Sequence, residues 1–546
     1  MKQEIYDLCV IGTGPAGIIA ALEFARNNPE KKVLLIEYGS EKKNGKNKLD
    51  DSIHIDNPVN HHGPYECTNK GLGGTSATWG GRCVMYNDID FIPRPVVGNG
   101  CTWDLELFTE TKKYLAKAAE YFECGEPAFD IREMTKGPQT PIAENFVNGD
   151  VIDTALERWS SPTRFGSRYK AEITSLANLD LVYDMEARDF GTPVGTGTVK
   201  ELTLRHTQTG TQHIIKSKFF ILAAGAQETT RILLRNPQLF DKLGSPPRAL
   251  GRYYQSHVSG KIASVKFYGD PRKTDYGFLR DKDNIYLRRR FQFADEYLAK
   301  NDLLNVAIWL DNPLYHDPAH KSGAMSFMYL AMITPVLGKK LAPPAIAESI
   351  TKGKVNKLGS HFLNVLKGLP GSLVIPARIF FKRYIGKRKL PGVFLYSAAN
   401  RYALHFHAEQ TPIEENAMRL GPDRQSLYIS YKLDPRDIHS IIKTHQKLDE
   451  WLRQCNCGEL EYWYPENELY AAIERISKDG IHQSGTTRIA DSADEGVVDR
   501  DLLLFGTDNV YICSSSVFPT SSQANPTFFI GCMAARLADH IKTKMG

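Results

Sequence analysis

The sequence of 546 residues lacks several features that would mark a metal-binding, membrane-spanning or secreted protein. Its nine cysteines include no CxxC pair, and Cys455-Asn-Cys457 lacks zinc-type spacing, so we expect reduced thiols and no metal site. No run of 18 apolar residues is present that could span a bilayer. Glu4 and Asp7 interrupt any apolar stretch at the start, which excludes a secretory signal and predicts a cytoplasmic protein.

Positive and negative charges nearly balance over the whole chain, but one segment is strongly basic. The net charge is only +5, yet residues 339–389 contain twelve Lys or Arg residues against one acid, Glu348. Apolar groups are interleaved with these cations, as in 362–366 and 379–385. This composition suits an anionic membrane surface or an acidic partner, while a solvated basic face over a packed helix pair is the alternative. We expect no nucleic-acid partner.

A glycine fingerprint follows the apolar run at 6–11. Gly12 permits a tight turn, Gly14 lets the backbone approach a pyrophosphate, and Gly17 allows close packing of helix on strand. Glu37 ends the next apolar run, where its carboxylate could accept hydrogen bonds from a ribose. The order of strand, glycines and acidic residue predicts a dinucleotide site, although it does not distinguish FAD from NAD. The alternative is a glycine-rich turn that binds nothing.

The remaining pattern predicts one α/β domain assembled from separated pieces. A glycine-rich loop at 71–83 could approach a cofactor closely. Apolar and polar residues alternate over 179–220, which predicts a β-meander. The meander leads into a strand at 219–225, which is almost entirely apolar and is therefore predicted to be central. A strand at 510–513 and a helix at 528–541 repeat the arrangement at the end of the chain.

The parts of the chain between these pieces are richer in aromatic and charged residues, and we predict that they form a substrate domain. Strand-like stretches at 325–333, 402–409 and 427–433 indicate a second, mainly antiparallel sheet with helices. The predicted fold class is α/β, with a Rossmann-like nucleotide domain interleaved with an α+β substrate domain. The expected boundaries are 1–95, 175–258 and 477–546 for the first domain, and 96–174 and 259–476 for the second.

One strand of the second domain has a polar face. Alternation over 402–409 places His405, His407 and Glu409 on the same side. Such a face could line a site for a polyol or an aminosugar, and it could equally be a solvated sheet face. Two histidines two residues apart also suggest a metal, but no third ligand is apparent, so we expect none.

Motifs at both ends of the chain together resemble the glucose-methanol-choline (GMC) family of FAD oxidoreductases. The resemblance is specific at the two ends and weak in the middle third, and it favours FAD over NAD. It is carried by the fingerprint, Gly73-Gly74-Thr75-Ser76, Leu222 to Ala226, Leu250 to His257, His482, Gly485, Thr486, Gly496 to Asp499, Val517 to Thr520 and Asn525 to Thr527.

The resemblance implies roles for individual residues. His482 matches the active-site base, and Asn525 matches the second residue beside flavin N5. An alcohol cannot easily lose a hydride until its hydroxyl proton is being removed, and a neutral imidazole can take that proton. Asn525 could then donate to the developing alkoxide. Besides the fingerprint residues, the implied FAD-binding set is Gly73, Gly74, Thr75, Trp79, Gly225, Ser514, Pro526 and Thr527.

The sequence departs from the family pattern at two positions. Members that bind FAD covalently often carry a histidine before the tryptophan of the glycine-rich loop, whereas this chain has Thr78 before Trp79, so we expect non-covalent FAD. Ser514 stands where many members have an aspartate, which weakens a ribityl contact, and we expect FAD to be held less tightly.

These observations predict a two-domain flavoenzyme that oxidises a hydroxyl on a sugar, glycoside or aminosugar. The missing secretory signal favours glycan or natural-product biosynthesis, by analogy. Alternatives are oxidation of a lipid, sterol-like or aliphatic alcohol, a redox-neutral lyase, and a flavin-bearing surface-binding protein without turnover. The electron acceptor is not assigned by the sequence.

Overall fold

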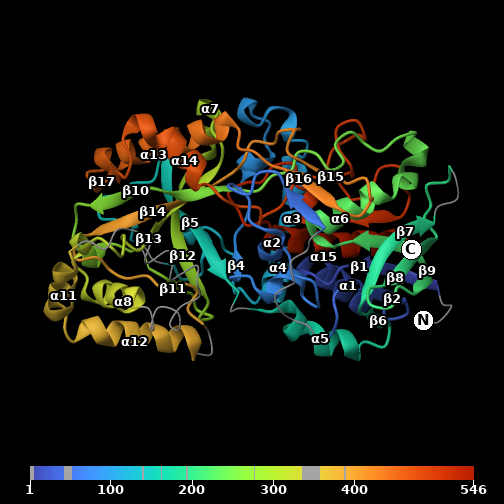
Figure 1. The fold of residues 1–546 in the computed structure, drawn as a ribbon, viewed down its shortest axis with the longest axis horizontal. Coiled ribbons are helices and arrows are strands. Elements are labelled where there is room, and N and C mark those ends of the chain that lie inside the picture. Colours follow the sequence, from blue (N-terminus) through green and yellow to red (C-terminus); the bar gives the residue numbers. More distant parts are fainter. Residues whose placement is uncertain are drawn as a thin grey trace.

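The computed structural model shows two sheets side by side along the longest axis, each covered by helices (Figure 1). Both chain ends lie in the half that contains β1 (Figure 1). No helix within the described ranges is both long and apolar enough to cross a bilayer. The structure describes residues 5–41, 52–137, 140–160, 163–191, 195–275, 277–334, 357–385 and 389–545.

The first sheet, within those ranges, has seven strands in the order β6-β2-β1-β9-β8-β7, with β18 pairing with β9. β6, β2, β1, β9 and β18 pair in parallel, and the apolar end of β9 lies between β1 and β18. The central strand predicted at 219–225 is thereby confirmed over its first residues, as is the strand at 510–513. The strands are β1 (Ile5–Ile11), β2 (Val33–Ile36), β6 (Leu179–Val182), β7 (Met185–Gly191), β8 (Glu201–His206), β9 (Gln212–Leu222) and β18 (Val510–Ile512).

The meander predicted over 179–220 is confirmed only in part. β7, β8 and β9 are antiparallel neighbours, as predicted. β6 instead pairs in parallel with β2 and extends the parallel half of the sheet. Alternation along a strand reports that one face is buried, but it does not report which neighbour the strand pairs with.

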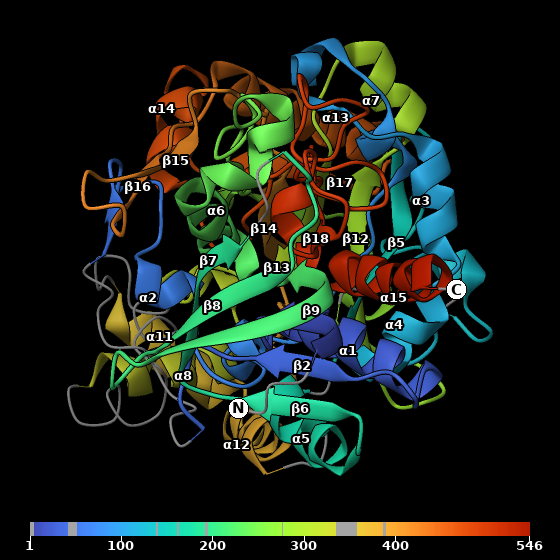
Figure 2. The ribbon, with the colours of Figure 1, turned by 90° about the vertical axis from the view of Figure 1, so that its right-hand side faces the viewer.

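Helices bury the apolar faces of this sheet. α15 lies beside α1 and α4 (Figure 2), and its apolar residues join those of α1 and β1 in the main core. The helix predicted at 528–541 is confirmed by α15. α5 packs on β6 and α1. The bounds are α1 (Pro15–Asn27), α2 (Pro64–Cys67), α3 (Leu105–Lys112), α4 (Leu115–Phe122), α5 (Phe165–Ser175), α6 (Gly225–Arg235) and α15 (Pro526–Met545).

The second sheet is antiparallel at every described pairing, in the order β17-β10-β14-β13-β12-β5-β4, with β11 beside β12. α13 and α14 lie on one side of it, and α8, α11 and α12 lie on the other (Figure 1). β14 confirms the strand predicted at 402–409. The strands are β4 (Arg82–Cys83), β5 (Val151–Trp159), β10 (Val258–Phe267), β11 (Leu279–Arg280), β12 (Tyr286–Phe293), β13 (Val306–Asp311), β14 (Arg401–Ala408) and β17 (Gly458–Tyr462).

Two predicted strands of this part differ from the structure. Residues 325–333 lie in helix α8, where the Ser322 hydroxyl accepts a hydrogen bond from the Met325 amide. The run is largely apolar and shows no alternation, a pattern that fits a buried helix as well as a buried strand. The strand predicted at 427–433 exists as β16 but belongs to a separate three-stranded sheet with β15 and β3. The remaining bounds are β3 (Ile53–Ile55), β15 (Ala417–Leu420), β16 (Leu427–Ser430), α7 (Asp295–Asn301), α8 (Gly323–Ile333), α11 (Leu358–Lys367), α12 (Gly371–Tyr384), α13 (Pro435–Gln454) and α14 (Leu469–Ile476).

Candidate active site

A cavity of about 470 Å³ is lined both by the glycine fingerprint and by the C-terminal block. The end of β1, the first turn of α1, the glycine-rich loop and the start of α15 contribute to its wall. Most of the predicted site residues therefore share one cavity. Those that line it are Gly12, Gly14, Glu37, Gly74, Thr75, Trp79, Gly225, His482, Ser514, Asn525, Pro526 and Thr527.

The fingerprint glycines take three different positions at this cavity. Gly12 has a φ of 107°, and a Cβ there would overlap the carbonyl of Ala223, directly after β9. A Cβ on Gly17, which lies behind the wall, would overlap the carbonyl of Gly12. Gly14, the N-cap of α1, would place a Cβ in open space. The helix N-terminus is thus exposed to the cavity, as the binding of a pyrophosphate requires.

Glu37 is buried and joins three segments of the chain. One carboxylate oxygen accepts hydrogen bonds from the hydroxyl and the amide of Thr13. The other accepts hydrogen bonds from the amides of Gly39 and Gly71, each at 2.7 Å. Glu37 therefore holds the glycine-rich loop against the fingerprint, a structural role that the sequence did not indicate beside the predicted ribose contact.

The glycine-rich loop packs directly on the fingerprint. Gly73 has a φ of 91° and begins a short 3₁₀ turn, and a Cβ on Gly74 would lie 3.1 Å from Gly14 Cα. Trp79 donates a hydrogen bond from its indole nitrogen to the Thr163 carbonyl at 3.0 Å. These contacts fix the loop as one wall of the cavity.

His482 and Asn525 meet at the same cavity, although 43 residues separate them in sequence. The Asn525 amide nitrogen donates a hydrogen bond to His482 Nε2 at 2.5 Å. His482 is partly exposed, whereas Asn525 is buried. Among the residues that the structure describes, no donor reaches Asn525 Oδ1. The pair therefore offers an imidazole nitrogen and an unsatisfied amide oxygen at one point.

Asp479 fixes the orientation of His482. Its Oδ2 accepts a hydrogen bond from His482 Nδ1 at 3.1 Å, and its Oδ1 accepts one from the amide of Ile481 at 2.8 Å. Because a carboxylate only accepts, the neutral His482 ring carries its proton on Nδ1 and has a lone pair on Nε2. Burial raises the pKa of Asp479, but His482 and His257 lower it more, so its net pKa lies well below the usual range.

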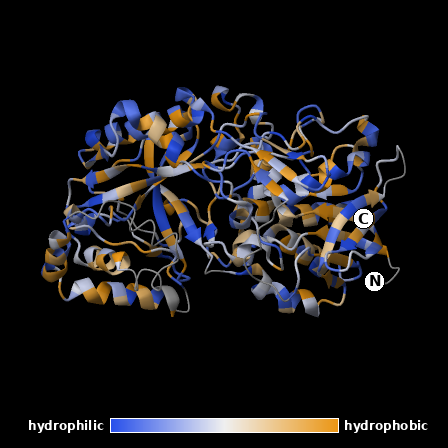
Figure 3. Cartoon of the chain, in the orientation of Figure 1, coloured by the Kyte–Doolittle hydropathy of each residue, from blue (hydrophilic) through white to orange (hydrophobic). Residues whose placement is uncertain are grey.

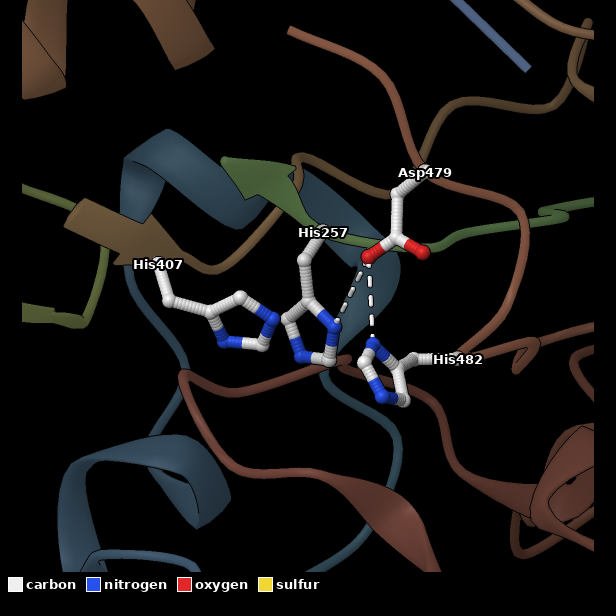
Figure 4. A group of neighbouring side chains, drawn as sticks. All are labelled: His257, His407, Asp479 and His482. Atoms are coloured by element: carbon white, nitrogen blue, oxygen red, sulfur yellow. Dashed lines mark hydrogen bonds and ion pairs between the residues drawn. The ribbon is translucent and has the colours of Figure 1, made fainter. Parts of the chain in front are cut away.

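Two further histidines complete a cluster around Asp479: His407 on β14, and His257 directly before β10 (Figure 4). His257 Nδ1 lies 3.5 Å from Asp479 Oδ2. The ring centroids of His257 and His407 lie 5.0 and 5.4 Å from that of His482. Burial, together with the neighbouring histidines, lowers the pKa of both residues, so both rings are neutral at pH 7.

The polar face predicted on β14 does not form a single site. His407 reaches the cluster, and its Nδ1 donates to the Gln523 carbonyl at 2.9 Å. His405 stacks on Trp309 with ring centroids 4.5 Å apart, and burial lowers its pKa to about 3. Glu409 follows the end of β14 and is paired with Arg94 at 2.9 Å, fully buried. This ion pair occupies the Glu409 carboxylate, which does not line the cavity beside His482.

The sequence analysis missed two members of the cluster and, with them, a set of candidate metal ligands. His257 was noted only within a motif, and Asp479 was not noted at all. The ligand atoms of His257, His407, Asp479 and His482 all lie within 4.8 Å of one another. The sequence analysis found no third ligand for His405 and His407, and so did not identify these neighbours of His407. An acid three residues before His482 was the signal that could have identified Asp479.

Residues 412–534, which include His482 and Asn525, match the family model described as GMC oxidoreductase. Over these residues the chain resembles the GMC oxidoreductases. This match and the residues that surround the cavity together support an FAD-dependent oxidoreductase. The sequence has no match among curated proteins.

Solved structures resemble this chain over its full length. A fungal aryl-alcohol oxidase has 16% identity and a TM-score of 0.54, and the alignment covers 100% of both chains. An FAD-dependent oxidoreductase from Chaetomium thermophilum has 15% identity and a TM-score of 0.53, with 99% of each chain covered. A formate oxidase from Aspergillus oryzae has 15% identity and a TM-score of 0.50, covering 100% of this chain and 99% of its own. At such identities the likeness establishes the fold.

The cavity fits FAD on structural grounds. The first turn of α1 and the bare Cα of Gly14 can hold the pyrophosphate. Gly225, at the start of α6, has a φ of 74° and no atom within 4 Å of a Cβ, so its backbone is open to a ligand. His482 and Asn525 line the same cavity.

Proposed function

We propose that this protein oxidises a hydroxyl group of a sugar, glycoside or aminosugar to the carbonyl, using non-covalently bound FAD. The observation that carries the proposal is the pair of His482 and Asn525 at the wall of the cavity, with His482 oriented by the buried carboxylate of Asp479. FAD, when bound, supplies the acceptor for the hydride that leaves the substrate carbon.

The proton of the substrate hydroxyl passes to His482. Its Nε2 has the lone pair because Nδ1 donates to Asp479. When Nε2 takes the proton, the ring becomes an imidazolium, which the adjacent carboxylate stabilises. The substrate hydroxyl must first displace the hydrogen bond that Asn525 makes to Nε2. The amide nitrogen thereby becomes free to donate to the developing alkoxide.

The same geometry argues against a metal in the histidine cluster. A metal bound to His482 Nδ1 would displace the proton to Nε2 and remove the lone pair that accepts the substrate proton. With the proton on Nδ1, Asp479, His257 and His407 form a buried polar support for the base. We therefore assign the cluster to proton transfer and to positioning.

Non-covalent binding is supported by the loop beside Trp79. Thr78 lies at the cavity, and its hydroxyl accepts a hydrogen bond from the Asn69 amide at 2.5 Å. A threonine hydroxyl at this point offers no imidazole to form a histidyl link to the flavin.

A polar substrate is supported by the groups that line the cavity. Arg82 lies at the wall, where its guanidinium pairs with Glu157. Gln483 and Ser515 contribute polar side chains next to His482. A wall with polar groups of this kind suits a substrate that carries several hydroxyl groups. A second candidate, a lipid or sterol-like alcohol, is favoured by the exposed apolar helices α11 and α12.

The test is an anaerobic screen of purified, FAD-loaded protein with sugars, glycosides, aminosugars and long-chain or sterol alcohols. We expect loss of flavin absorbance with at least one carbohydrate, and little loss with the lipid alcohols. Bleaching by lipid alcohols alone would replace the proposal with the second candidate. Product formation while the flavin stays oxidised would indicate a redox-neutral lyase.

A further inference from the structure

A helical unit on the substrate sheet has no role in the chemistry proposed above. α11 and α12 both pack on α8 (Figure 1). The His361 ring meets the Ser326 hydroxyl at 3.0 Å, and the Asn364 amide donates to the Pro318 carbonyl at 2.9 Å. A Cβ on Gly323 would lie 3.2 Å from Gly368 Cα, so the helices approach closely. The inner side of the unit is thus an ordered interface.

The outer side of α11 and α12 is apolar and exposed. Of the 24 large hydrophobic side chains that are exposed in the described part of the chain, eleven lie within residues 358–385. Both helices show apolar residues along their length (Figure 3). These residues define what we call the apolar face: Leu358, Phe362, Leu363, Leu366, Leu369, Leu373, Val374, Ile375, Phe380, Phe381 and Ile385.

Helical spacing gathers these side chains along each helix. On α11, Leu358, Phe362 and Leu366 are four residues apart and lie on one side. On α12, Val374 and Phe381 are seven residues apart, which is nearly two full turns. A soluble monomer rarely exposes so concentrated a set, and such patches mark interaction surfaces.

The charged residues on and around the apolar face are all Lys or Arg. The sequence contains no Asp or Glu from residue 349 to 389. The described side chains of Lys357, Lys367, Arg378, Lys382 and Lys389 are all exposed. The predicted basic segment also includes 339–356 and 386–388, which lie outside the described residues. Every charge that surrounds the apolar face in the described part of the two helices is therefore positive.

We propose that α11 and α12 dock this enzyme on the headgroup region of an anionic lipid membrane. Cations would pair with anionic headgroups while Phe362, Leu366 and Phe381 enter the boundary with the acyl chains. At 1.5 Å per residue, the 14 residues of α12 extend about 21 Å, less than the roughly 30 Å of a hydrocarbon core, so the helix lies along the surface.

A second copy of the chain fits this surface less well. A two-fold dimer through the apolar face would place the same patch on both sides of the interface. The cations of one copy would then face those of the other, with no acid on either face to pair with them. Anionic lipid supplies the missing charge, which is why the charges favour a membrane over self-association.

The experiment is co-sedimentation of the full-length holoprotein with vesicles of phosphatidylcholine, with and without phosphatidylserine, at low and high salt. We expect binding to the anionic vesicles at low salt and release as the salt is raised. Each basic residue near anionic lipid is worth about fivefold in affinity. The combined change Lys367→Glu, Arg378→Glu and Lys382→Glu should therefore weaken binding about 100-fold or more.

A second variant tests the apolar contribution. Phe362→Ser with Leu366→Ser should weaken binding at least tenfold, while the matched pair Val147→Ser with Ile214→Ser, equally exposed elsewhere, should not. Flavin absorbance and reduction by a soluble substrate should stay unchanged in all of these proteins, which separates this proposal from the proposed catalytic function.

Three results would overturn the proposal. These are equal recovery with neutral and anionic vesicles, binding that survives the charge reversals, and a concentration-dependent dimer in light scattering that the apolar variant dissociates while vesicles recruit nothing. The last result would assign the apolar face to a second copy of the chain.

Discussion

Replacing Asp479 by Asn tests the orientation of the base with the smallest change in shape. The carboxylate accepts the His482 Nδ1 proton at 3.1 Å, and only 5% of its side chain is exposed, so solvent screens the interaction little. A hydrogen bond to a charged group is worth about 1.5 to 3 kcal/mol. At about 1.4 kcal/mol for each factor of ten in rate, flavin reduction should slow by about 10- to 150-fold.

The pH dependence separates this role from a merely structural one. The pKa of Asp479 lies well below its usual range, so the carboxylate is ionised throughout the assay range and does not itself cause a rise in rate. In Asp479→Asn the pH profile of flavin reduction should differ from that of the wild type, because the buried negative charge beside His482 is lost.

The assay is anaerobic stopped-flow measurement of flavin absorbance at several substrate concentrations. We expect a lower limiting rate, a nearly unchanged half-saturating concentration and normal FAD content. Asp437→Asn is the matched control: this acid is fully buried elsewhere, and burial raises its pKa to about 7. A rate within twofold of the wild type, with the same pH profile, would refute the assigned role of Asp479.

The remaining predictions concern the base, the cofactor and acid stability. His482→Ala should retain FAD but slow flavin reduction about 100-fold or more, whereas Asn525→Ala should slow it less. Near-normal flavin reduction in His482→Ala would contradict the mechanism. Acid precipitation should release all of the FAD, because Thr78 cannot form a histidyl link, and a yellow pellet would contradict this. Burial lowers the pKa of His445 to about 4. Below about pH 6.5 the unfolded chain therefore binds a proton on this histidine that the folded chain does not bind. The free energy of unfolding should fall between pH 6.5 and 4, by up to about 3 kcal/mol. Urea unfolding of His445→Leu should show a shallower loss over that interval, and an unchanged pH slope would count against it.

Local signals predicted the nucleotide half of the fold well. The strand, fingerprint and helix from residue 5 to 27 are adjacent in sequence, and their hydrogen bonds are local or between neighbouring strands. The apolar end of β9 was predictable for the same reason, since a parallel strand that is buried on both faces has a continuous apolar run.

The failures arose where distant residues decide the outcome. Glu409 pairs with Arg94, 315 positions away, and no pattern on β14 encodes that partner. Asp479 and His257 are brought together only by the packing of the second sheet beside the C-terminal block. The helix at 325–333 was missed because an apolar run without alternation fits a buried strand as well as a buried helix.

The proposed function requires that the chain oxidises an alcohol with His482 as the base. The test is a single anaerobic turnover of the wild type and of His482→Ala, with equal FAD content and the best carbohydrate from the screen. We expect wild-type flavin to be bleached with one carbonyl formed per flavin, while bleaching in the variant is at least about 100-fold slower. Equal bleaching rates, or flavin that stays oxidised with every alcohol, would contradict it.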